Sequence, residues 1–335
     1  MTVHKTMIDE KIDFDNITRN ESAFGVVNPK CLFLDPLNDY SPGGPLYIES
    51  VVSTVINLIG AVIATSGNAI IILTFWKSDN LRSQSHLFLW CLAFADFLTG
   101  LIVQPFYGAY KIAYLAGRVS TSCVLRVIFE TFAWFSAALS CSLFASITGE
   151  RYLALHYHLR YHEVVTTRKI RVYLAYLIIT TAILSLSRFA TKSVEIFLYI
   201  NIFGLLSSLF VLLICYWKIY KQVRRHFRQI QDQSKTSEGS QTMDVQRFKK
   251  SVINMAYVAV LYMISYLPFT CILFAYLCNG FTINVEAAYD ITRTMAFMPS
   301  SWNPFIYFWK MHELREAVKK VVKRNYTTFT ESIEL

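Results

Sequence analysis

Seven long apolar stretches, separated by shorter polar ones, dominate the pattern of the chain. Each is long enough to cross a bilayer as a helix, and a helix satisfies its own backbone hydrogen bonds in lipid. The pattern therefore predicts an all-α membrane protein with a seven-transmembrane helix bundle over residues 47–310. The fourth stretch is the shortest, and we expect its helix to extend into its flanks. The stretches are residues 50–76, 83–110, 127–149, 172–187, 196–217, 250–276 and 287–309.

Lysine and arginine are unequally distributed over the polar segments that join these stretches. If the N-terminus lies outside, the inner segments hold 22 of the 32 basic residues. Because basic residues accumulate on the cytoplasmic side, we predict an extracellular N-terminus, a cytoplasmic C-terminus and a multi-pass position in the plasma membrane. The third inner segment, residues 225–246, is rich in polar residues and is expected to be a mobile loop.

Both ends of the chain are polar and are predicted to lie outside the bundle. Residues 1–46 form an extracellular tail, in which Asn16 and Asn20 begin glycosylation triplets. Residues 311–324 alternate leucine and valine with basic residues, a pattern typical of an amphipathic helix on the anionic inner surface of a membrane. Residues 325–335 form a cytoplasmic tail, and membrane lipids are expected partners.

The composition supports a membrane protein and argues against several other classes. Hydrophobic residues make up 54% of the chain and charged residues 16%, whereas charged residues are about 25% of a soluble domain. The net charge of +9 follows the predicted topology, so we expect no nucleic-acid partner. The sequence shows no catalytic constellation, so neither an enzyme nor an organic cofactor is expected. A transporter or channel is the alternative class, although only Asp96 lies deep in an apolar stretch.

Cysteine usage predicts one disulfide outside the membrane. Of the seven cysteines, Cys31, Cys123 and Cys278 are predicted to face the same outer side. One disulfide among these three is expected there, with one thiol left over. The sequence does not choose the pair.

The third apolar stretch ends in Glu150-Arg151-Tyr152, where an acid, a permanent cation and a phenol meet at a membrane boundary. Charge at such a place is costly and usually functional, although arginine and tyrosine also serve as simple interface anchors. Four further motifs occur in order along the chain. Together with Glu150-Arg151-Tyr152 they make about residues 48–324 resemble a class A (rhodopsin-like) G-protein-coupled receptor. Those motifs are Gly67-Asn68, Leu92-Ala93-Phe94-Ala95-Asp96, Leu267-Pro268 and Asn303-Pro304-Phe305-Ile306-Tyr307.

The resemblance implies that a heterotrimeric G protein binds at the inner end of the bundle. Arg151 would pair with Glu150 at rest and face the G protein after activation, while Pro268 would bend the sixth helix and make it a lever. The residues that the resemblance assigns to coupling and activation are Glu150, Arg151, Tyr152, Tyr216, Tyr266, Pro268, Asn303, Pro304 and Tyr307.

The resemblance also implies a sodium pocket around Asp96, with Na⁺ as an allosteric ion. An isolated carboxylate at mid-membrane depth would be costly, so a cation or a proton is expected to neutralise it. A protonated Asp96 bonded to Asn303 is the alternative. The residues implied as oxygen ligands are Asp96, Asn68, Ser140, Ser300 and Asn303.

Within the family, the second inner loop around Leu159-Arg160-Tyr161 and the run from Asn303 to Arg315 are similar to those of adenosine and melanocortin receptors. The chain also departs from the family pattern. Phe248 stands where an acid often faces the arginine of the third helix, so measurable basal activity is predicted. Tyr266 stands where the sixth helix usually has tryptophan.

The ligand is predicted to be a small peptide or a small molecule, held in an aromatic pocket in the outer half. Ala133 replaces the aspartate of amine receptors, and Leu273 replaces the asparagine of adenosine receptors, so both ligand classes are disfavoured. Glu130 and Arg293 are the two charges expected there as ligand anchors, unless they or Asp290 pair with each other. The candidate aromatic residues of the pocket are Phe106, Trp134, Tyr266, Phe269 and Phe297.

Overall fold

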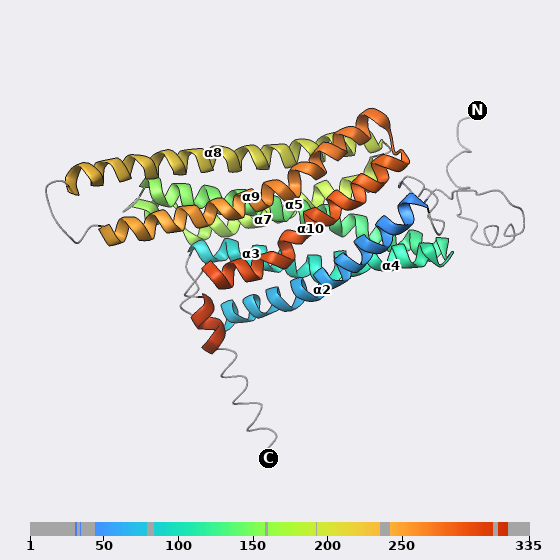
Figure 1. Cartoon of the computed structure of the whole chain (residues 1–335), viewed down its shortest axis with the longest axis horizontal. Helices are drawn as coiled ribbons and strands as arrows, with labels where there is room; N and C mark the ends of the chain where they lie inside the picture. The colour runs from blue at the N-terminus through green and yellow to red at the C-terminus, as the bar shows by residue number, and fades with distance from the viewer. Residues whose placement is uncertain are drawn as a thin grey trace, which may run out of the picture.

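The computed structural model shows helices running side by side along the long axis of the molecule (Figure 1). The predicted all-α helix bundle is thereby confirmed. Asn16, Asn20 and the tail 325–335 lie outside the described residues, so their predicted roles stay predictions. The structure describes residues 31, 34, 44–78, 84–157, 160–191, 193–234, 242–310 and 314–320.

The helices follow the predicted apolar stretches and extend most of them at both ends. α7, for instance, reaches well beyond both ends of the short fourth stretch, as expected. The helices are α2 (Pro45–Lys77), α3 (Gln84–Leu98), α4 (Gln104–Leu115), α5 (Val119–Tyr157), α6 (Tyr161–Val164), α7 (Thr167–Ala190), α8 (Val194–Ser234), α9 (Thr242–Asn279) and α10 (Ile283–Lys310), with the π-helix η2 (Thr99–Val103) between α3 and α4.

Among the described residues, six helical spans are long and apolar enough to cross a membrane: one each from α2, α5, α7, α8 and α9, and one that joins α3, η2 and α4. α10 is less apolar because its N-terminal half carries Glu286, Asp290 and Arg293, all of them buried. It nevertheless packs between α9 and α2 and completes the bundle. The charges of α10 therefore face the interior of the protein.

The second span is longer than its apolar stretch, and the predicted end at residue 110 is wrong. η2 inserts one wide turn ahead of Pro105, and the helix then continues as α4 to Leu115. One extra residue in a helical turn rotates everything that follows by about 100°. This rotation places Tyr107 and Lys111 one turn apart in the interior, where both are buried.

The predicted loop over residues 225–246 is also wrong at both of its ends. α8 continues to Ser234 and α9 begins at Thr242, so both helices extend beyond the rest of the bundle (Figure 1). Residues 235–241 lie outside the described residues. The helical parts of this region, residues 225–234 and 242–246, contain two arginines and four glutamines, which are good helix formers, so polarity alone did not end the helices.

Two local features of the fold correspond to features of the sequence: the glycine of the Gly67-Asn68 motif and the amphipathic segment after α10. A Cβ atom added at Gly67 would lie 2.8 Å from the ring of Pro304, so α2 approaches α10 this closely only because residue 67 is glycine. In the short helix 314–320, Leu314 and Val318 are buried and Lys319 is exposed. This part of the predicted amphipathic helix is helical and two-sided, and its remaining residues lie outside the described ones.

Candidate functional site

A cluster of buried charges joins four helices in the half of the bundle that holds the N-terminal ends of α2, α5 and α10. Arg293 of α10 lies at its centre: one guanidinium nitrogen donates to Glu130 Oε1 at 2.7 Å, and the other to Asp290 Oδ1 at 2.5 Å. The second nitrogen also donates to the Tyr110 hydroxyl at 2.9 Å. The predicted anchors Glu130 and Arg293 therefore pair with each other, and Asp290 joins them, as the alternative expectation had it.

Lys111 is a further cation in this cluster, and the sequence analysis missed it. Its ammonium pairs with Asp290 and donates to Ser50 Oγ at 3.2 Å. Glu49 of α2 lies close enough to interact electrostatically with Lys111 and Asp290, and its Oε1 atom accepts a hydrogen bond from Ser53 Oγ at 2.5 Å. Lys111 follows its apolar stretch directly, so it resembled an ordinary lysine at a membrane boundary. Only the rotation at η2 turns it inward.

Aromatic rings enclose the central guanidinium of this cluster. Its carbon lies 4.6 Å from the centre of the Phe129 ring, 4.7 Å from that of Tyr289 and 5.2 Å from that of Tyr107. Cation–π contacts and ion pairs together balance the cost of burying Arg293 in a medium of low dielectric constant.

The aromatic residues predicted to line one ligand pocket belong to two separate hydrophobic clusters. Trp134 packs on Phe269 at 5.8 Å between ring centres, within the larger cluster, which also contains Tyr266. Phe297 belongs to the smaller cluster, and Phe106 packs against it. The structure therefore places Trp134, Phe269 and Tyr266 in one cluster and separates them from Phe106 and Phe297.

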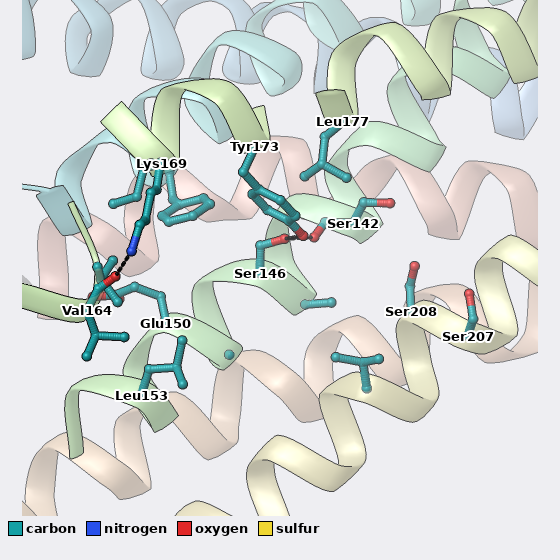
Figure 2. Close-up of a pocket in the computed structure, with 16 residues that line it drawn as sticks. Ser142, Ser146, Glu150, Leu153, Val164, Lys169, Tyr173, Leu177, Ser207 and Ser208 are labelled. Carbon is teal, nitrogen blue, oxygen red and sulfur yellow. Dashed lines mark hydrogen bonds between the residues drawn. The ribbon is translucent and has the colours of Figure 1, made fainter. Parts of the chain in front are cut away.

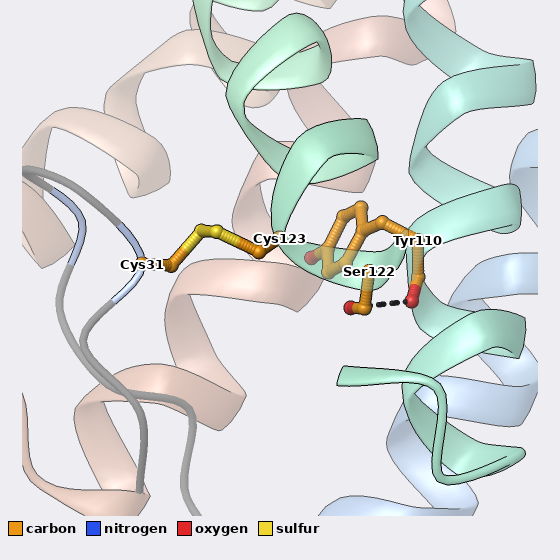
Figure 3. The surroundings of a disulfide bond; sticks show 4 residues. All are labelled: Cys31, Tyr110, Ser122 and Cys123. Carbon is orange, nitrogen blue, oxygen red and sulfur yellow. Dashed lines mark hydrogen bonds between the residues drawn. A yellow bond between two sulfur atoms is a disulfide. The ribbon is translucent and has the colours of Figure 1, made fainter. Parts of the chain in front are cut away.

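One disulfide closes the same end of the molecule. Cys31 bonds to Cys123, in the second turn of α5, and a Cα–Cα distance of 5.4 Å is ordinary for a disulfide. Next to it, Ser122 Oγ donates to the carbonyl oxygen of Tyr110 at 2.9 Å and ties α5 to α4 (Figure 3). Cys278 is an exposed free thiol, so the structure chooses one of the pairings that the sequence left open.

Asp96 lies fully buried at the middle of the bundle. Ser300 Oγ donates to its Oδ1 at 2.8 Å, and Asn303 Nδ2 donates to its Oδ2 at 2.7 Å. The Oδ1 atom of Asn68 and the Oγ atom of Ser140, both implied ligands, have no hydrogen-bond partner among the described residues. These unpartnered buried oxygen atoms and the carboxylate fit a sodium ion, which prefers oxygen ligands.

At the opposite end of α5, Glu150 is buried and Arg151 is one-third exposed. The Nε atom of Arg151 lies 3.5 Å from Glu150 Oε2, and the hydroxyl of Tyr161 donates to Glu150 Oε1. The buried carboxylate of Glu150 therefore has two partners, and one of them, the guanidinium of Arg151, remains partly accessible to another protein. Tyr152 stacks on the ring of His156 at 5.7 Å.

The family resemblance implies that Tyr216 and Tyr307 meet near Arg151 in the active state. The hydroxyls of Tyr216 and Tyr307 have no hydrogen-bond partner among the residues that the structure describes. Nearby, Tyr266 stacks on Tyr262, which in turn stacks on Phe144 of α5 at 3.9 Å. α9 runs through Pro268 without a break, and α10 through Pro304.

The sequence was also compared with known protein families. The chain matches the rhodopsin family of 7-transmembrane receptors over residues 67–195 and 187–307, which is most of its length. It belongs to this family. Membership of the rhodopsin family implies coupling to a G protein. It excludes the alternative of a transporter or channel, and it also excludes an enzyme.

This rhodopsin-family receptor is similar, at a distance, to receptors named for different ligands and to one whose name gives no ligand. It is 26% identical to the histamine H2 receptor of Cavia porcellus, covering 81% of this chain and 79% of that receptor. It is 22% identical to the adenosine receptor A2a of Homo sapiens, covering 83% and 74%. It is 28% identical to G-protein coupled receptor 12 of Rattus norvegicus, covering 81% and 83%. The predicted similarity to adenosine receptors is confirmed at this distance.

Proposed function

We propose that this receptor carries a signal from an extracellular ligand to a heterotrimeric G protein that binds beside Arg151. The observation that carries the proposal is the state of that residue: its partner Glu150 is buried and bonded, while one-third of the Arg151 side chain remains exposed. Releasing one ion pair of 3.5 Å would free a cationic donor for a peptide of the G protein. The excess of basic residues supports a cytoplasmic position for this end.

The ligand is proposed to be a small peptide or a small molecule that acts on the outer charge cluster. Ala133 and Leu273 are both buried and apolar, which disfavours ligands of the amine and adenosine type. A charged ligand would instead exchange with one partner of Arg293. Such an exchange requires the ligand to offset the desolvation of its own charge and the loss of a partner by the displaced acid, which a carboxylate that bonds the guanidinium with both oxygens could do.

Nucleotide exchange on purified Gα subunits tests the coupling. Because the sequence has Phe248 where the family often has an acid facing this arginine, the purified full chain is expected to accelerate exchange on at least one Gα without an added ligand. Arg151→Ala is expected to reduce this rate at least tenfold, because the cationic contact is lost. Exposed Arg168 provides the control, and Arg168→Ala should retain the rate. Identical rates for the receptor and Arg151→Ala would refute the proposal.

Sodium is proposed to bind at Asp96 and to favour the resting state. Asn68, Ser140, Ser300 and Asn303 would complete the oxygen ligands, and the ion would neutralise the carboxylate. We expect about 150 mM NaCl to raise the thermal denaturation temperature of the purified receptor above that in N-methylglucamine chloride of the same concentration. Because the two solutions have the same ionic strength, they screen charges equally, and the difference reports sodium binding. Asp96→Asn should remove the difference. A difference that persists in Asp96→Asn would refute the site.

A further inference from the structure

A cavity of about 530 Å³ lies between α5, α7 and α8 (Figure 2). It begins beside Glu150 and extends along α5 to Ser142, about 12 Å further into the membrane at 1.5 Å per residue. The outer charge cluster uses Glu130 of the same helix, a further 18 Å or so away by the same measure. The cavity is therefore separate from the proposed ligand site, and its volume suits a small molecule.

One acid, Glu150, and one cation, Lys169, line the end of the cavity next to Arg151. Lys169 lines it in the first turn of α7, where its ammonium donates to the carbonyl oxygen of Val164 at 2.9 Å (Figure 2). No ion pair to Lys169 is formed by the described residues, whereas Glu150 already holds Tyr161 and Arg151. The N-terminus of α7 adds a partial positive charge at the same place. An anion at this end would complete the ammonium's bonding.

Hydroxyl groups line the middle and the far end of the cavity, and apolar side chains form the rest of the wall there. Ser146 Oγ lies 2.8 Å from the Tyr173 hydroxyl, and it also donates to the carbonyl oxygen of Ser142 at 2.6 Å (Figure 2). Leu177 and Val211 provide apolar wall on α7 and α8. A ligand here meets charge first and then the hydroxyls of Ser146 and Tyr173. At the far end it meets apolar side chains together with Ser207 and Ser208, whose hydroxyls already donate to the carbonyl oxygen of Gly204.

The cavity opens toward the lipid rather than toward the centre of the bundle. Two of its lining residues, Tyr173 and Val211, are 42% and 46% exposed, and their neighbours Tyr176 and Phe210 are each 63% exposed. Apolar side chains exposed on membrane-spanning helices face the acyl chains of the bilayer. A molecule can therefore enter from the membrane with its hydrocarbon part leading.

We propose that this cavity binds a fatty carboxylate: its carboxylate pairs with Lys169 near the cytoplasmic boundary, and its single acyl chain lies along Ser146, Leu177 and Val211. The site goes beyond the proposed function, since it uses none of the outer cluster. It also shares Glu150 with the proposed coupling site, so an anion bound at Lys169 would lie close to the carboxylate that holds Arg151.

Photolabelling with a diazirine derivative of palmitic acid tests the proposal directly. The full chain, in nanodiscs of phosphatidylcholine, is irradiated with the probe and mapped by mass spectrometry. Label is expected in the lining segments of α5, α7 and α8, and excess palmitate should reduce it at least fivefold. Excess palmityl alcohol, which lacks the charge, should not. The readout needs no G protein, so failure of the proposed coupling would leave it unaffected.

Two variants and one control sharpen the test. A Cβ atom at Gly149 would have Cys215 Sγ as its nearest neighbour, at 4.0 Å, so Gly149→Leu can fill the cavity and should abolish specific labelling. Gly204→Leu on α8 is the matched control, because nothing lies within 4 Å of a Cβ atom there and it does not line the cavity. Lys169 is exposed, so Lys169→Gln should leave the fold intact, and it should lower labelling at least fivefold.

Three results would overturn the proposal. Label spread evenly over the membrane-facing helices would show that the probe reports only bulk lipid. Equal labelling in Lys169→Gln and the parent receptor would show that Lys169 does not bind the carboxylate of the probe. This result would count even if Gly149→Leu failed to fold. Competition by phosphatidylglycerol but not by palmitate would assign the site to a two-chain phospholipid instead.

Discussion

Replacing Arg293 by glutamine is expected to destabilise the receptor by about 3–5 kcal/mol, a loss that folded yield and thermal denaturation in detergent will detect. The guanidinium serves Glu130, Asp290 and Tyr110 at once, and all four groups are buried. Removing it leaves the buried Glu130 carboxylate without its 2.7 Å partner. Breaking one side of a buried ion pair costs more than removing both sides.

A double variant separates the ion pair from side-chain size. In Arg293→Gln/Glu130→Gln both charges are absent, so part of the lost stability should return relative to Arg293→Gln alone. Lys319→Gln is the control for an exposed ion pair, since Lys319 and Glu316 are 62% and 42% exposed, and it should change stability by less than about 1 kcal/mol. Equal denaturation midpoints for all three variants would contradict the interpretation.

The same variants address the ligand. If a charged agonist exchanges with one partner of Arg293, Glu130→Gln should shift its potency in a dose-response measurement. Unchanged potency for every agonist in both Glu130→Gln and Arg293→Gln would remove these two residues as anchors. The cluster would then be purely structural.

Removing the Cys31–Cys123 disulfide is expected to cost about 2–5 kcal/mol, because the bond closes a long loop in the unfolded chain. The two residues are 92 positions apart, and the bond fixes the segment at Cys31 to the second turn of α5. Cys31→Ser and Cys123→Ser should each lower surface expression and thermal stability. The double variant should be no worse than either single one, since one bond is lost in every case.

Cys278 supplies the matched control for this experiment. It is an exposed thiol at the end of α9 on the same side of the bundle, and Cys278→Ser should leave stability and expression unchanged. A loss in Cys278→Ser equal to that in Cys123→Ser would mean that a different pair forms in the cell.

Hydrophobic periodicity and motif order determined the membrane-spanning segments and the family. Both are local properties: a run of apolar residues must become a helix in lipid wherever it packs, and motifs such as Asn303-Pro304 keep their order along the chain. The charged end of the third apolar stretch at Arg151 and the buried acid Asp96 could be identified for the same reason. The ends of the helices could not, because helix formers continue α8 and α9 past the apolar residues.

Contacts between distant segments were decided only by the tertiary structure. The wide turn at η2 rotates Lys111 into the bundle, and no local pattern distinguishes that lysine from one at a membrane boundary. The choice of Cys31 as the partner of Cys123, and of Arg293 as the shared partner of Glu130 and Asp290, depends on which helix ends meet. The cavity beside Lys169 likewise exists only because α7 and α8 diverge over α5, which leaves a space that apolar spacing along one helix does not encode.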